Sequence, residues 1–86
     1  MPSRSLPYWW SWPLVIPDHA ANRMEERGWT EIEVRRVLGQ PRSLDQDPEP
    51  GRWRVPCRRG REHWCIIVEP EKRRRWLVMV TIIRVD

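Results

Sequence analysis

The stretch DHAANRMEERGWTEIEVRRVLGQP, residues 18–41, contains the signals for two consecutive helices. After Asp18, a suitable N-cap residue, small and apolar side chains recur at helical spacing at Ala20, Ala21 and Met24. Gly28 is placed to end this first helix, because glycine readily adopts the left-handed conformation of a helix C-terminus. The pattern therefore predicts a short amphipathic helix over residues 18–28.

The second helix has clearer boundaries. Thr30 and Glu33 have the spacing of a capping box, and Gly39 is followed by Pro41, which cannot continue a helix. Between these boundaries lies an apolar stripe at i, i+3 and i+4, formed by Val34, Val37 and Leu38. We expect a pair of helices within residues 18–39.

The C-terminal part, residues 52–85, predicts a β-meander. RWRVPC (52–57), EHWCIIVE (62–69) and WLVMVTIIRV (76–85) are β-rich, and the first two alternate in polarity. Two short turns join them, which requires antiparallel pairing. Pro56 favours an edge position for the first strand, and residues 42–51 are expected to form a loop.

The third predicted strand is apolar on both faces. Strict alternation puts four residues on one face (Trp76, Val78, Val80 and Ile82) and four on the other (Leu77, Met79, Ile83 and Val85). One helix layer covers only one face of a sheet. The second face must be covered by the Trp-rich N-terminus, by a second copy or by another protein. Within that N-terminus, residues 12–16 are expected to form a short edge strand.

Length and composition indicate one domain over residues 1–86, with a Trp-rich extension at residues 1–13. The sequence has neither a run long enough to span a membrane nor an apolar signal core, so we expect a cytoplasmic protein. Cys57 and Cys65 are the only cysteines, and no C-x-x-C pair is present. We expect no metal site and two reduced thiols.

The charge is unevenly distributed along the chain. Residues 1–51 contain six basic and eight acidic side chains, whereas residues 52–86 contain ten basic and four acidic ones. Fifteen of the sixteen basic residues are arginine, which binds phosphate through a planar fork and stacks on bases. This basic half favours a nucleic-acid partner. The competing interpretation is an arginine-rich proteome that places arginine on every surface.

His19, Arg23 and Arg27 form a stripe about 80° wide on an ideal helix, because each four-residue step advances about 40°. An imidazole and two guanidiniums suit a phosphodiester in its transition state. Alternatively the stripe is a solvated surface, balanced by the neighbouring Glu25 and Glu26. Weaker candidates lie in the strands and turns: His63, Arg74, Trp76 and Thr81.

The motif H-x3-R-x3-RG-W-T-x2-E-V-x2-VL-x2-P, from His19 to Pro41, precedes a closing strand that contains V-T-I. With this order of elements, the chain from residue 15 to residue 85 resembles small prokaryotic toxin-like domains allied to BrnT, within the RelE/ParE toxin superfamily. The resemblance implies an α+β fold in which two N-terminal helices pack on a three- to four-stranded antiparallel sheet.

The resemblance also implies a ribonuclease that acts without metal or cofactor and is neutralised by a cognate antitoxin. In such enzymes the RNA 2′-hydroxyl attacks the adjacent phosphate. His19 and Arg23 match the signature His and Arg, Arg27 precedes the RG glycine, and Thr81 matches the threonine of the closing strand. By charge, the RNA, free or on the ribosome, would contact a further set: Arg54, Arg59, Arg61, His63, Arg74 and Trp76.

Two other functions remain open. The chain is alternatively a non-catalytic module that binds nucleic acid or protein through its basic strand half and apolar sheet face. It is alternatively a small interaction protein that forms a homodimer through that face.

Overall fold

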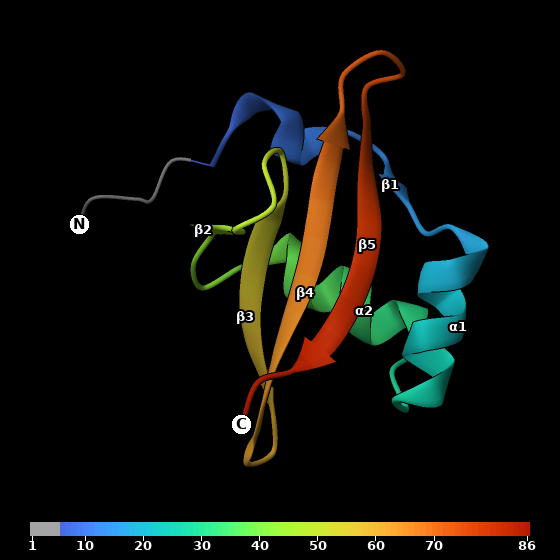
Figure 1. The fold of residues 1–86 in the computed structure, drawn as a ribbon, viewed down its shortest axis with the longest axis vertical. Coiled ribbons are helices and arrows are strands. Elements are labelled where there is room, and N and C mark those ends of the chain that lie inside the picture. The colour runs from blue at the N-terminus through green and yellow to red at the C-terminus, as the bar shows by residue number, and fades with distance from the viewer. Residues whose placement is uncertain (1–5) are drawn as a thin grey trace.

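The fold is α+β, as Figure 1 shows for the computed structural model, which describes residues 6–86. Residues 1–5 of the expected Trp-rich extension lie outside the described residues. The elements in chain order are a 3-10 helix η1 (Tyr8–Ser11), β1 (Leu14–Val15), α1 (Asp18–Glu26), α2 (Glu31–Gly39), β2 (Asp45–Gln46), β3 (Trp53–Arg59), β4 (Glu62–Glu71) and β5 (Trp76–Arg84).

The sheet has five strands in the order β1-β5-β4-β3-β2. The expected antiparallel meander forms its centre, but the expectation of a three- to four-stranded antiparallel sheet was wrong. β1 pairs with β5 in parallel, and β2 adds an antiparallel pair to β3 from the segment expected to be a loop. The sheet is therefore mixed, and both additional strands are two residues long.

α1 ends as the sequence predicts, although its N-cap is Pro17 rather than Asp18. The Gly28 N–H donates to the Glu25 carbonyl and the Trp29 N–H donates to the Met24 carbonyl. Together with a φ of 75° at Gly28, these bonds form a Schellman motif. The helix thus turns sharply and leads directly into α2.

α2 begins with the predicted capping box. The Glu33 N–H donates to Thr30 Oγ1 at 3.2 Å, and the Thr30 N–H donates to Glu33 Oε1 at 2.9 Å. Val34 and Leu38 are buried and Val37 is partly buried against the core, as the stripe predicts. On α1, Ala20 and Met24 are buried, but Ala21 is exposed, contrary to the expected apolar side.

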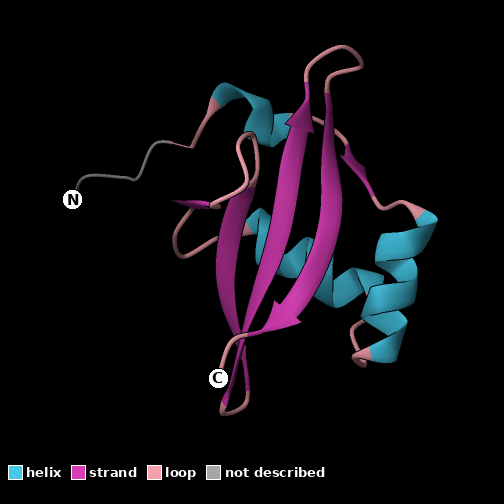
Figure 2. Cartoon of the chain, viewed as in Figure 1, coloured by secondary structure: helices cyan, strands magenta, loops and turns pink. Residues whose placement is uncertain are grey.

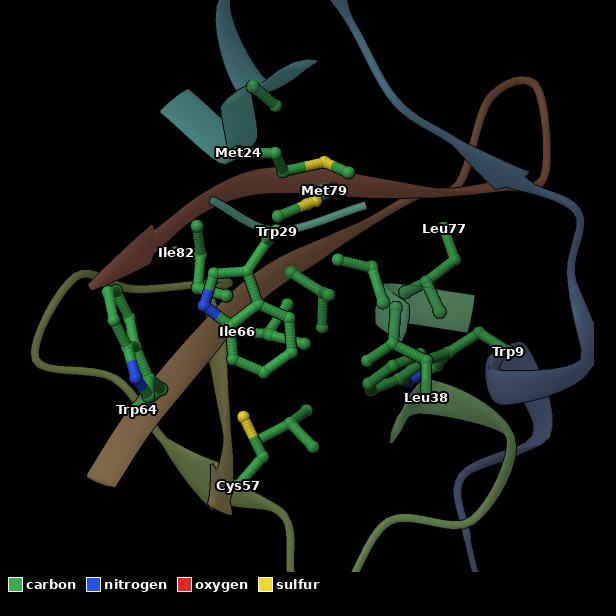
Figure 3. Close-up of a cluster of buried hydrophobic side chains, with 14 residues drawn as sticks. Trp9, Met24, Trp29, Leu38, Cys57, Trp64, Ile66, Leu77, Met79 and Ile82 are labelled. Carbon is green, nitrogen blue, oxygen red and sulfur yellow. The ribbon is translucent and has the colours of Figure 1, made fainter. Parts of the chain in front are cut away.

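The core fills the space between the helices and one face of the sheet. Figure 3 shows Trp9 and Leu38 at one end of this cluster and Trp64 at the other, with Ile66 between them. Trp9 of η1 also contacts Trp53, with ring centroids 5.7 Å apart. The Trp-rich segment therefore belongs to the core side of the sheet and not to its second face.

The second face, which we call the open face, carries no helix (Figure 2). A β-bulge between Ile67 and Val68 shifts the register opposite Val80. As a result Ile82 faces the core together with Leu77 and Met79, and not with Trp76, Val78 and Val80 as strict alternation predicted. Before the bulge the open face of the three long strands carries Arg54, Pro56, Arg58, His63, Cys65, Ile67, Thr81 and Ile83, and on the other side of the bulge it carries Glu69 and Val78.

Cys57 and Cys65 are free thiols, as expected. Cys57 is paired with Trp64 and belongs to the core, whereas Cys65 is paired with Pro56 on the open face. Burial raises the pKa of Cys57 to about 11. None of the helices within residues 6–86 is long and apolar enough to cross a membrane.

Candidate nucleic-acid-binding groove

The outer edge of β3 is only half covered. β2 pairs with Trp53 and Arg54 alone, so residues 55–59 pair only with β4. Pro56 lies in this free part, which fits the expected edge position because proline donates no hydrogen bond to a neighbouring strand. A free edge next to the end of α2 leaves room for a surface depression.

Three adjoining hollows follow this free edge, and we call them together the β3 groove. The first, about 270 Å³, lies at the β3 edge; Arg42, Pro56, Arg58 and His63 line it together with the core residues Cys57 and Trp64. The second, about 130 Å³, lies between the end of α2 and β3 and shares Arg42, Pro56 and Arg58 with the first. The third, about 150 Å³, is lined by Trp29, Glu33, Arg36, Val37, Arg58 and Arg59.

The β3 groove is strongly basic. Its lining contains four arginines, namely Arg36, Arg42, Arg58 and Arg59, and a single carboxylate, Glu33. The pKa of Glu33 is lowered, first by the hydrogen bond from the Thr30 backbone and also by the charges of Arg59 and Arg36. An anionic ligand would complete the charge balance of this surface.

Arg59 is held in place by aromatic packing. Its guanidinium carbon lies 5.1 Å from the ring centroid of Trp29, and Trp29 packs edge-on against Trp64 with centroids 5.7 Å apart. A Cβ at Gly28 would lie 3.7 Å from Arg59 Nη1, an ordinary van der Waals contact, so the φ of 75° and not the guanidinium favours glycine there. Trp29 and Trp64 are only 5% and 6% exposed, so they orient arginine but are too buried to stack on bases.

Three of the groove arginines differ from several arginines elsewhere in the chain in making no ion pair within its described part. Within residues 6–86, Arg36, Arg58 and Arg59 make no ion pair. Arg54 and Arg35, by contrast, are both paired. Arg54 Nε lies 2.6 Å from an oxygen of Asp47 and Arg35 Nε lies 2.7 Å from an oxygen of Glu31. The pKa of Asp47 is lowered by its hydrogen bond from Arg54, so the charge of Arg54 is already compensated.

None of the three residues of the α1 stripe, His19, Arg23 and Arg27, lines the β3 groove. His19 and Arg23 are exposed, and Arg27 is partly buried with Nη1 lacking a hydrogen-bond partner in the described chain. Glu26 Oε1 lies 3.8 Å from Arg23 Nη1 and 4.0 Å from Arg27 Nη1. One carboxylate therefore offsets part of the positive charge of the stripe, and its catalytic role stays a prediction.

The remaining predicted residues are spread over the sheet. Thr81 lies on the open face in the row Arg54–Ile67–Thr81, whereas His63, four residues before Ile67 in β4, pairs with Arg58. Arg61 is exposed in the turn after Gly60. The β4–β5 hairpin, with Arg74 over Trp76 at 5.1 Å, lies at the opposite end of the sheet from the β3–β4 turn (Figure 1).

Of the predicted RNA contacts, Arg59 and His63 line the β3 groove. Sequence reasoning missed Arg36, Arg42 and Arg58. The available signal was the CRRGR turn at residues 57–61, whose first arginine pairs with His63 across the hairpin. Nothing local to Arg36 or Arg42 indicates that they meet it.

Metal-ligating side chains do not cluster in the described part of the chain. Within residues 6–86 no group of three or more His, Cys, Asp or Glu side chains is arranged to hold a metal ion. The charged and titratable side chains that do line the groove include its four arginines, Glu33 and His63.

The fold and the groove define a small α+β domain with a basic groove at a sheet edge. The chain belongs to the DUF4258 family, a domain of unknown function, whose family model matches residues 16–86. No curated protein and no solved structure matches the chain.

Proposed function

We propose that this chain binds RNA along the β3 groove and cleaves it as a metal-independent endoribonuclease of a toxin–antitoxin pair. The observation that carries the proposal is the set of four arginines around one sheet edge, faced by a single carboxylate. A guanidinium group can bind two oxygens of one phosphate, and the RNA backbone carries a phosphate at every nucleotide.

The groove favours contacts to the phosphate backbone over contacts to bases. The tryptophans beside it are buried, and Arg59 is positioned as a cation by Trp29. Binding of this kind is tolerant of sequence and sensitive to salt. The resemblance to toxin ribonucleases adds the expectation of cleavage by the 2′-hydroxyl, on free or ribosome-associated RNA.

The test uses end-labelled single-stranded RNA, incubated with the purified chain in excess chelator. We expect scission that persists in chelator and is lost in Arg58→Ala, with Arg52→Ala as the control. Arg52 is a matched control because it directly precedes β3 in the sequence but is already paired, with its Nε 3.1 Å from Glu69 Oε1. Arg23→Ala in parallel tests the α1 stripe. RNA that is neither bound nor cut would refute the proposal.

A second candidate is a protein-binding role for the open face. Cys65 and Ile67 are buried there by neighbouring side chains, and Ile83 and Val78 remain partly exposed without a covering element from residues 6–86. The Trp-rich segment packs on the core side, so we propose that a cognate antitoxin or a second copy covers this face. Sedimentation of the chain alone distinguishes them, because a homodimer forms without any other protein.

A further inference from the structure

We infer that His63, facing Arg58 in the first hollow of the β3 groove, is the residue that accepts the 2′-hydroxyl proton during RNA cleavage. The inference rests on the proposed function and names the residues of its reaction site. It differs from the sequence-based expectation, which assigned this chemistry to His19 on α1.

The register of the sheet brings His63 and Arg58 together. They are direct partners across β3 and β4, and both project from the open face. Directly opposed residues of an antiparallel pair have Cβ atoms about 5 Å apart. An imidazole and a guanidinium at that spacing can contact a hydroxyl and the adjacent phosphate of one nucleotide.

The hollow around this pair has the size and charge for such a group. It measures about 270 Å³, and Arg42 and Ser43 also line it. Arg42 and Arg58 thus bring guanidiniums from two segments to one hollow, where they would stabilise the charge that develops on the oxygens of a bound phosphate. The second hollow adjoins it through the same two arginines, so the bound strand continues along the groove.

The backbone of His63 is fixed on both sides. Its N–H donates to Asp86 Oδ2 at 3.3 Å, and its carbonyl accepts from the Val85 N–H at 2.9 Å. Arg84 Nε holds the other Asp86 oxygen at 2.9 Å, and this hydrogen bond is the main cause of the lowered pKa of Asp86. The main chain of His63 is therefore held in place, and its exposed side chain starts from a fixed position beside the hollow.

The reaction balances without a metal or redox partner. The 2′-oxygen attacks phosphorus, the bond from O2′ to phosphorus forms and the bond from phosphorus to O5′ breaks. The 2′-hydroxyl proton passes to the His63 imidazole, the departing 5′-oxygen takes a proton from water, and the resulting hydroxide takes the proton back from the His63 imidazolium. The products are a 2′,3′-cyclic phosphate and a 5′-hydroxyl.

The experiment compares His63→Gln, His19→Gln and wild type in two assays. Cleavage is measured on labelled RNA, and binding is measured on the same sequence as a 2′-O-methyl strand, which lacks the nucleophile. We expect His63→Gln to lower the cleavage rate by about 100-fold or more while binding changes by less than about twofold. His19→Gln should leave cleavage near the wild-type rate. Arg35→Ala, outside the groove, serves as the control variant.

A second readout separates chemistry from structure. His63→Gly should regain part of its cleavage activity when free imidazole is added, and the product should end in a cyclic phosphate; a merely structural role would not respond to imidazole. Cleavage that survives His63→Gln, or that disappears in His19→Gln alone, overturns the inference and leaves the proposed function standing. A wild-type chain that binds neither strand refutes the proposed function itself.

Discussion

Removing one groove arginine should change the salt dependence of RNA binding by a calculable amount. Each phosphate contact on a single strand contributes a slope of about −0.7 to the plot of log affinity against log salt. If all four groove arginines contact phosphates, the slope is about −2.8, and affinity falls about 50-fold between 50 and 200 mM salt. Arg36→Ala should reduce the slope to about −2.1 and the loss to about 18-fold.

The matched control is Arg35→Ala. It removes the same charge from the adjacent position of α2, but Arg35 is bound to Glu31 and lies outside the β3 groove. Fluorescence anisotropy of a labelled single strand, titrated at several salt concentrations, gives both slopes. The reasoning is refuted if the two variants change the slope equally, because net charge and not the groove would then determine binding.

Three further predictions concern stability and reactivity. Trp29→Phe should cost about 2 kcal/mol less than Trp64→Phe in urea unfolding, because Trp29 Nε1 is buried without a partner whereas Trp64 Nε1 donates to a carboxylate at 2.9 Å. The Cys57 thiol, with its pKa raised to about 11 by burial, should react with Ellman's reagent at pH 8 only after the chain is unfolded. The pKa of Asp47 is lowered in the folded chain, so ionised Asp47 stabilises the fold at pH values above its ordinary pKa of 3.8, and this stabilisation is lost as the pH falls through the folded pKa. Asp47→Asn should therefore be less stable than wild type at neutral pH and similar to it in strong acid.

The helices could be predicted because their boundaries are encoded locally. The capping box at Thr30 and Glu33, and the glycine that ends α1, each act within a few residues along the chain. Such signals are independent of the rest of the fold. The predicted pair within residues 18–39 accordingly matches α1 and α2 closely, apart from the N-cap of α1.

The three long strands were predicted, and β1 lies within residues 12–16, where a short edge strand was expected. β2 and the parallel pairing of β1 with β5 were not predicted, because a two-residue strand shows no periodicity and its pairing depends on partners far along the chain. The bulge at Val80 changes which side of β5 faces the core, and no local residue indicates it. Strict alternation therefore assigned Ile82 to the wrong face.

The sequence predicted the kind of side chain that lines the candidate groove, but not most of the individual residues. Arginine content indicated an anionic partner, and Arg59 and His63 were among the expected contacts. Arg36, Arg42 and Arg58 come from a helix, a loop and a strand, which only the fold brings to one edge. Sequence spacing likewise gives no sign that Arg54 is already bound to Asp47.

The positions of the arginines that do and do not pair with carboxylates bear on a question raised by the sequence: whether the arginines serve a function or reflect composition alone. An arginine-rich composition would place cations on every surface without regard to shape. In this chain several arginines outside the groove are tied to carboxylates, while Arg36, Arg58 and Arg59 have none within residues 6–86 and surround connected hollows.

The β4–β5 hairpin is the informative comparison. Its cations at residues 72–75 are exposed and make no ion pair in the described chain, yet the turn that carries them projects from the end of the sheet. Water can solvate such a turn fully. At the β3 edge Arg36, Arg42 and Arg58 are exposed as well, but together with the partly buried Arg59 they line adjoining hollows. Several cations around one concave surface raise the local potential for an anion more than the same cations on a projecting turn. Charge together with a concave surface, rather than charge alone, is therefore the reason for proposing the groove as the binding surface.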